Sequence, residues 1–147
     1  MDPFFFEDFE MNAEYLTAAR TVTEADVVSF AGVSGDYNPL HTDEEFAKQG
    51  MFGTRVAHGM LVASITSGLV NQTDILNRTI IAFLGLTCNF KGPVKFGDTI
   101  SVRLRVIEKR DMQSPEAGLV RLAAFVSNQR RELVLDGDFL LLMKKRG

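Results

Sequence analysis

The stretch HGMLVASITSGLVNQTDIL, residues 58–76, decides the fold of this 147-residue chain. Its composition favours a helix, and its apolar positions are Met60, Leu61, Val62, Ala63, Ile65, Leu69 and Val70. These side chains would lie all round the helix rather than along one stripe, and a helix that is apolar on every side is usually buried. The sequence therefore predicts a long central helix with the rest of the chain packed around it.

Four candidate strands follow this helix, at residues 80–90, 98–109, 119–128 and 133–144. Turn residues separate them at short spacing, which favours antiparallel connections over helical crossovers. The second strand is the clearest, because apolar and polar residues alternate along it. One buried helix and a mostly antiparallel sheet predict an α+β fold in which the sheet wraps the helix.

Short elements are expected in the part of the chain that precedes the helix. Residues 15–22 resemble a strand. Thr23, with an acidic residue three places on, resembles an N-cap that opens a short helix over residues 24–32. An Asn-Pro pair then forces a turn, so residues 33–41 are expected to form an ordered, non-helical loop, and an acidic segment starts another short helix within residues 42–50. Ordered loops of this kind often hold functional residues.

Composition excludes several classes of protein. A net charge of −3, with no long run of either sign, argues against a nucleic-acid binder. Cys88 is the only cysteine, which excludes an internal disulfide and a cysteine zinc site. No export signal is visible, and no apolar run approaches the roughly 20 residues that cross a bilayer. We expect one cytoplasmic domain over residues 1–147, bound to neither membrane nor nucleic acid.

The two histidines, His41 and His58, are the only residues available for imidazole chemistry. His41 follows Asp36 by five residues across a proline turn, with Asn38 between them. This spacing can bring a carboxylate and an imidazole into one small volume, where they would divide proton abstraction and donation on a shared water. The competing interpretation is structural: Asp36 forms a turn, Asn38 belongs to an ordinary loop and His41 caps the next helix. Too few ligands are present for a convincing metal site.

Gly59 lies at the start of the central helix, where backbone N–H groups have no partner within the helix. A glycine there lets a carbonyl oxygen approach the backbone closely, as an oxyanion site requires. A helix-start glycine without a ligand is the alternative, and for His58 a capping or packed role is favoured. Ser64 and Ser67 lie on neighbouring parts of one helix face, and their hydroxyls need partners. Either helix carbonyls or the Asp36 carboxylate could serve.

Three segments together resemble the signature of a known family. They are FAGVSGDYNPLH at residues 30–41, HGM at 58–60 and GPVKFGDTI at 92–100. Ala47 follows the first segment after a gap of five residues. The combination closely resembles the MaoC-like, R-specific enoyl-CoA hydratases, and the resemblance covers nearly the whole chain. It implies a single hot-dog fold, in which an antiparallel sheet wraps a long central helix. The α+β fold inferred from the pattern agrees with this.

The resemblance also implies the chemistry of the site. Asp36 and His41 would hold a water and activate it for addition across the 2,3-double bond of an enoyl thioester. The Gly59 N–H would stabilise the enolate-like thioester oxygen, and Ser67 would orient Asp36. The remaining residues expected to bind substrate or to support the pair are Asn38, His58 and Ser64.

The expected substrate is an acyl thioester of coenzyme A or of acyl carrier protein. No cofactor is expected, because the chain lacks a Gly-x-Gly-x-x-Gly segment and a P-loop. A single hot-dog unit exposes a sheet edge, so a homodimer is the smallest expected assembly. Two other functions stay open: a hot-dog thioesterase, which would release free thiol, and a non-catalytic acyl-CoA-binding module. The intact Asp36 and His41 pair argues against the binding module.

Overall fold

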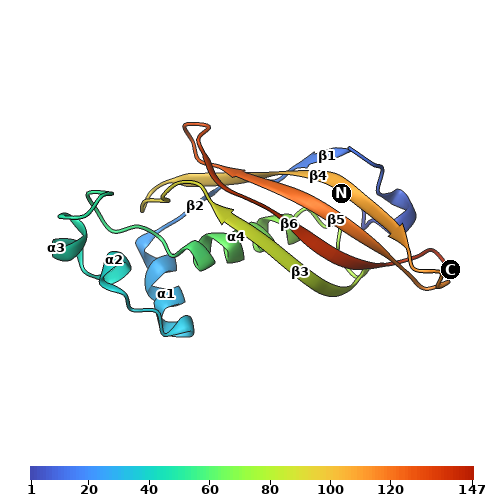
Figure 1. Ribbon diagram of the computed structural model, residues 1–147, viewed down its shortest axis with the longest axis horizontal. Coiled ribbons are helices and arrows are strands. Elements are labelled where there is room, and N and C mark those ends of the chain that lie inside the picture. The colour runs from blue at the N-terminus through green and yellow to red at the C-terminus, as the bar shows by residue number, and fades with distance from the viewer.

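Long strands from the second half of the chain form the body of a curved sheet, seen in the computed structural model of residues 1–147 (Figure 1). All strand pairs are antiparallel, in the order β1-β4-β5-β6-β3, and β2 also pairs with β4. The strands are β1 (Glu14–Leu16), β2 (Arg20–Thr21), β3 (Ile80–Phe90), β4 (Thr99–Asp111), β5 (Ala117–Ser127) and β6 (Leu133–Lys144). The four long strands predicted from the sequence are therefore confirmed, and β3 lies at one edge of the sheet.

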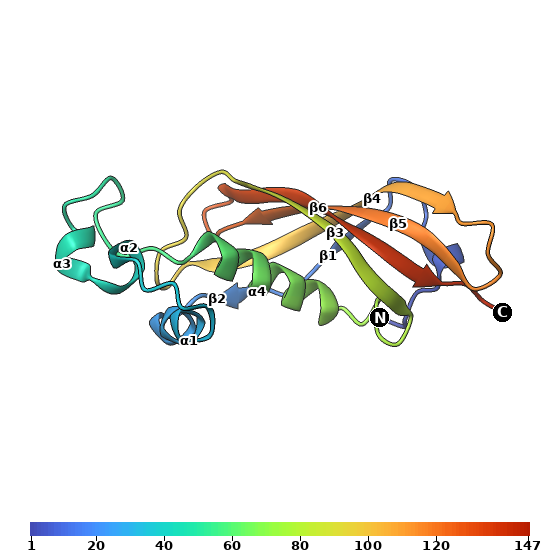
Figure 2. The ribbon, with the colours of Figure 1, turned by 60° about the horizontal axis from the view of Figure 1, so that its bottom comes forward.

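The helix α4 (Gly59–Asn71) lies along the inner face of this curved sheet (Figure 2). Its buried side chains are Leu61, Val62, Ala63, Ile65, Thr66, Leu69 and Val70. One side of the helix stays open, because Met60 is 59% exposed and Ser64 is also exposed. The prediction of burial on every side was wrong for that side. The helix also ends before residue 76, since the chain enters turns in which Asp74 adopts a left-handed backbone with φ 69°.

The alternation along β4 is confirmed, and it explains how the sheet holds the helix. Ile100, Val102, Leu104 and Val106 are each at most 1% exposed. They share one core cluster with buried residues of α4, β5 and β6. Burial of this kind stabilises by about 25 cal/mol for each Å² of apolar surface removed from water. The result is a sheet wrapped on a central helix, which is the hot-dog arrangement and an α+β fold.

A small helical lobe projects from one end of the sheet, at the left of Figure 1. It consists of α1 (Glu24–Ser34), α2 (Pro39–Thr42) and α3 (Glu44–Ala47). The predicted cap of α1 is confirmed: Thr23 Oγ1 accepts from the Asp26 N–H at 3.1 Å, and the Asp26 carboxylate accepts from the Thr23 N–H at 2.9 Å. Gly35, with φ 78°, ends the helix.

Two expectations for the first part of the chain were wrong in detail. Residues 33–41 are not wholly non-helical, because α1 continues to Ser34 and α2 begins at Pro39. A proline fits the first turn of a helix, where its missing N–H is no loss. The strand expected over residues 15–22 is interrupted, because the Thr17 hydroxyl accepts a hydrogen bond from the Val102 N–H at 3.0 Å. A short 3-10 helix, η1 (Phe6–Asp8), precedes β1.

No helix of the structure combines the length and the apolar character that crossing a membrane requires.

Candidate active site

A cavity of about 630 Å³ opens where the helical lobe meets the start of α4 and the loop after β3. Its polar and charged lining consists of Asp36, His41, His58 and Lys91. Its apolar lining consists of Leu40, Phe52, Val56, Ala57, Met60, Val62, Phe90, Pro93, Val94 and Val134, and Gly59 and Gly92 complete it. A concave, mainly apolar pocket with a few convergent polar groups is the usual form of a small-molecule site.

Asp36 is held by the backbone of the loop between α1 and α2. Its N–H donates to Ser34 Oγ at 3.1 Å, and its Oδ1 accepts from the Asn38 N–H at 3.1 Å. An aspartate that bonds to the backbone two residues on forms a common turn. The turn-forming interpretation of Asp36 is thus correct as far as Oδ1 is concerned. The second carboxylate oxygen has no hydrogen-bond partner in the chain, so it is available to a ligand in the cavity.

His41 belongs to α2 and is oriented by a backbone carbonyl from another segment. Its Nδ1 lies 2.7 Å from the carbonyl oxygen of Val56. A carbonyl can only accept, so the neutral ring carries its hydrogen on Nδ1. The lone pair of Nε2 then remains free on a side chain that lines the cavity. The alternative role for His41, a cap on the next helix, does not apply, because Asp43 caps α3.

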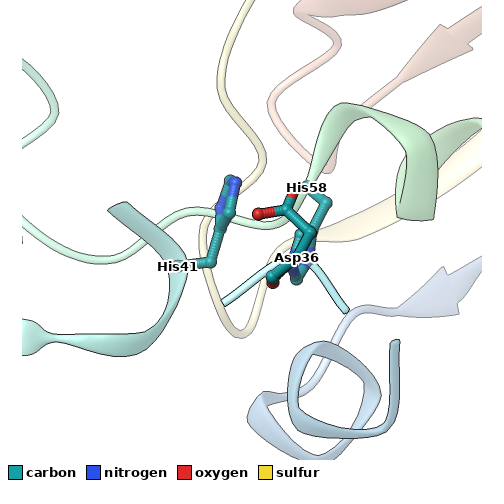
Figure 3. A group of neighbouring side chains, drawn as sticks. All are labelled: Asp36, His41 and His58. Carbon is teal, nitrogen blue, oxygen red and sulfur yellow. Dashed lines mark hydrogen bonds between the residues drawn. The ribbon is translucent and has the colours of Figure 1, made fainter. Parts of the chain in front are cut away.

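Asp36, His41 and His58 converge, as Figure 3 shows, from the loop before α2, from α2 itself and from the residue before α4. One side-chain O or N atom from each lies within 4.8 Å of the others. Two hydrogen bonds of ordinary length through one water span such a distance. The rings of His41 and His58 are stacked, with centroids 4.0 Å apart and planes at 29°.

His58 is 2% exposed and occupies the N-cap position of α4, but its side chain forms no cap hydrogen bond. Instead its Nε2 lies 2.9 Å from the main-chain oxygen of Asp36. The packed role that the sequence favoured is confirmed, and the capping role is not.

Gly59 lines the cavity, and its amide is unpaired. The N–H groups of Gly59, Met60 and Leu61 donate to no acceptor in the chain, since the first helical bond runs from Val62 to His58 at 3.1 Å. Such a helix start attracts negative charge. The ring of Phe90 fills the space beside Gly59, so a Cβ at this position would lie 2.9 Å from it. A larger residue at position 59 would therefore have to displace the Phe90 ring.

Three residues expected in the site lie outside the cavity lining. Asn38 caps α2, with Oδ1 accepting from the Leu40 N–H at 3.0 Å. Ser64 donates to the Met60 carbonyl at 2.8 Å. Ser67 is eight residues beyond Gly59, about 12 Å along the helix axis. No hydrogen bond joins it to Asp36 within one chain.

The segment that supplies the Val56 carbonyl is tied to the lobe by charged groups. Arg55 pairs with Glu24 of α1 at 2.8 Å and lies 3.8 Å from Glu44 of α3. Thr54 also donates to Glu44, and this hydrogen bond, reinforced by Arg55, outweighs burial and holds the pKa of Glu44 below its usual value. Sequence reasoning missed Val56, because a carbonyl that orients a histidine is present in every residue and leaves no pattern.

Comparisons with known proteins identify the family of the chain. The model of the MaoC-like domain family matches residues 8–127. The 3-hydroxybutyryl-CoA dehydratase of Methylorubrum extorquens is 35% identical, over 97% of this chain and 85% of its own. An (R)-specific enoyl-CoA hydratase of Rhodospirillum rubrum is 30% identical over 97% of this chain and 94% of its own. A solved structure described as a monoamine oxidase regulatory protein, from an Archaeoglobus, has a TM-score of 0.92 and 40% identity, covering 100% of this chain and 98% of that one. By these matches the chain belongs to the MaoC-like domain family.

Proposed function

We propose that this protein is a carbon–oxygen lyase that adds water to the 2,3-double bond of an enoyl-CoA, or removes it from a 3-hydroxyacyl-CoA, with R stereochemistry at C3. The observation that carries the proposal is the cavity itself. Asp36, the free Nε2 of His41 and the unpaired Gly59 N–H all line it. They are an acid, a base and an amide donor, which is the set that water addition to a thioester needs.

The proposed reaction transfers one proton through the Asp36 and His41 pair. A water held between the two side chains loses a proton to this pair as its oxygen bonds to C3. The electrons of the double bond move toward the thioester carbonyl, and its oxygen gains negative charge beside the Gly59 N–H. The pair then returns the proton to C2, so the atoms balance with no redox partner. The dehydration direction uses the same groups in reverse.

The substrate class follows from the lining of the cavity and from the relatives. Its walls are mainly apolar, as an acyl chain requires. The curated relatives are named for 3-hydroxybutyryl-CoA and enoyl-CoA. We propose that an acyl thioester, carried by coenzyme A or by acyl carrier protein, is the substrate, and that the reaction needs no cofactor.

We also propose that the working form is a homodimer joined along β3. This strand is an edge of the sheet, and its exposed apolar side chains include Phe83, Leu84 and Leu86. Exposed edges with apolar rows are sites of strand pairing. A second copy of the chain offers the same row, so a two-fold pairing would cover both. Sedimentation analysis is expected to give twice the mass of the chain, and a monomer at micromolar concentration would contradict this.

The function is tested by following the enoyl-thioester absorbance of crotonyl-CoA in the presence of the purified protein, with a thiol-reactive dye in a parallel sample. We expect the absorbance of the enoyl thioester to fall and the signal of the thiol-reactive dye to stay unchanged. Release of thiol would instead identify a thioesterase. Binding of the thioester with no change in either signal would identify a non-catalytic acyl-CoA-binding module.

A further inference from the structure

His58 is a deeply buried polar residue that the proposed reaction does not use. The residue is 2% exposed. It occupies the N-cap position of the central helix, but its side chain forms no cap hydrogen bond. Its Nε2 reaches the main-chain oxygen of Asp36, 22 residues away, at 2.9 Å. Its Nδ1 is buried and has no hydrogen-bond partner in the chain. Buried polar atoms are normally paired, so this arrangement calls for an explanation.

The two contacts of His58 select one state of its ring. The Asp36 carbonyl only accepts, so Nε2 must carry a hydrogen. A hydrogen on Nδ1 would point at no acceptor, so the ring is the neutral Nε2–H form. His41 is in the opposite form, because its Nδ1 donates to the Val56 carbonyl. The two stacked histidines therefore differ in which nitrogen carries the hydrogen, and only His41 keeps a lone pair toward the cavity.

The His58 ring also packs against two other rings. The His41 ring stacks on it at 4.0 Å, and Phe30 of α1 packs at 4.9 Å with the planes at 58°. Figure 3 shows His58 lying close against both Asp36 and His41. The next residue in the chain, Gly59, carries the unpaired amide. One side chain thus connects the acid, the base and the amide donor through a hydrogen bond, a ring stack and a peptide bond.

We propose that His58 is a positioning residue, which sets Asp36 and His41 relative to the Gly59 N–H without exchanging a proton itself. This rests on the proposed function, because it assigns the three groups their roles. A fixed geometry matters at such a site, since a misplacement of about 1 Å costs on the order of 100-fold in rate. The loop that holds Asp36 contains no buried residue between 32 and 39, so apolar packing does not set its place.

Two variants separate the hydrogen bond from the stacking. In His58→Phe the ring and its volume remain, but the donor to Asp36 is lost. In His58→Gln the amide nitrogen takes nearly the position of Nε2 and keeps a donor, but the ring is lost. We expect His58→Phe to lower kcat about 100-fold with KM changed less than about threefold, because the side chain positions the reacting groups rather than the substrate. The kcat of His58→Gln is expected to be at least tenfold higher than that of His58→Phe.

The state of the two rings can be read directly in the wild-type protein. With only two histidines in the chain, nitrogen-15 spectra of labelled histidine contain two ring systems, and His58→Phe assigns them. We expect one Nδ1–H ring and one Nε2–H ring in the free protein. Two rings of the same form, or a second hydrogen on His58, would overturn the proposal.

The kinetic measurements can overturn the proposal independently of the spectra. A His58→Phe enzyme with wild-type kcat, or one in which only KM rises, would show that His58 does not position the reacting groups. Failure of the proposed function has a different signature, because the wild-type protein would then leave crotonyl-CoA unchanged. The nitrogen-15 spectra would still report the opposite ring forms in that case.

Discussion

The inner face of the sheet and the loop that carries Asp36 are held in place by different forces. On the sheet, residues such as Leu104 and Leu122 are fully buried in one apolar cluster. In the loop, Asp36 is exposed, and α2 has no buried residue at all. The loop is placed instead by single hydrogen bonds, including those from His41 to Val56 and from His58 to Asp36. The difference teaches that stability and activity should respond to different substitutions.

The largest effect should appear in the loop and should be confined to activity. Asp36→Asn replaces a carboxyl group that can exchange a proton by an amide of the same shape, so kcat is expected to fall about 10³-fold, equal to about 4 kcal/mol of activation energy. The thermal midpoint should stay within about 2 °C, because no buried contact is lost. Steady-state kinetics on crotonyl-CoA and a melting curve measure the two quantities.

Asp43→Asn is the matched control for this change. Asp43 caps α3 from the same lobe and lies outside the cavity lining. Asparagine caps as well as aspartate, so activity and stability should both be retained. Equal loss of activity in the two variants would mean that Asp36 acts through general charge on the lobe.

The converse effect is expected on the sheet. Leu104→Ala should lower the free energy of unfolding by about 3 kcal/mol, since it leaves a cavity in the core. Its kcat per folded molecule should remain near wild type. Leu16→Ala, on an exposed edge residue of β1, is the control and should change stability by less than about 0.5 kcal/mol. Urea titration, with activity measured below the unfolding transition, tests this. A Leu104→Ala enzyme that folds but lacks activity would show that stability and activity do not respond to different substitutions.

A smaller effect is expected where the two regions meet, at the start of α4. Gly59→Ala forces the Phe90 ring away and crowds the amide, so kcat/KM should fall about tenfold, or about 1.4 kcal/mol. Gly68→Ala on the same helix meets nothing within 4 Å and should stabilise the protein by about 0.5 kcal/mol. If Gly59→Ala keeps full kcat/KM, as Gly68→Ala should, access of the substrate to the amide at position 59 does not require a glycine.

The smallest expected effect is on the stability of the protein at acidic pH. Burial raises the pKa of Asp26, but hydrogen bonds from Thr23 and Arg20 outweigh it and hold the pKa below its ordinary value of 3.8. The charged form therefore stabilises α1 above that value, and this contribution is lost as the pH falls below it. Asp26→Asn should be less stable than wild type at pH 7, and the gap should narrow at pH 3. Parallel stability curves for the two proteins would contradict this.

The sequence predicted best those parts of the molecule in which the same signal recurs along the chain. The bounds of β3 and β6 matched the predicted ranges, because turn residues separate the strands along the sequence. The helix α2 was missed, since a four-residue helix follows from a single cap by Asn38 rather than from a repeat. The convergence of Asp36, His41 and Gly59 on one cavity was expected from the family signature. The partner of His41 was not predictable, because it is a main-chain carbonyl at Val56.

The groups proposed to act on the substrate come from one part of the chain, whereas part of the apolar lining of the cavity comes from another. Asp36, His41, His58 and Gly59 all come from a run of 24 consecutive residues, 36–59, whereas Phe90, Val94 and Val134 come from the sheet and its loops. Substitutions in the sheet can therefore reshape the pocket for another acyl group while the proton-transfer groups remain in place. Such a division makes the fold easy to diversify in evolution and by design, since substrate preference can drift without the reaction being lost.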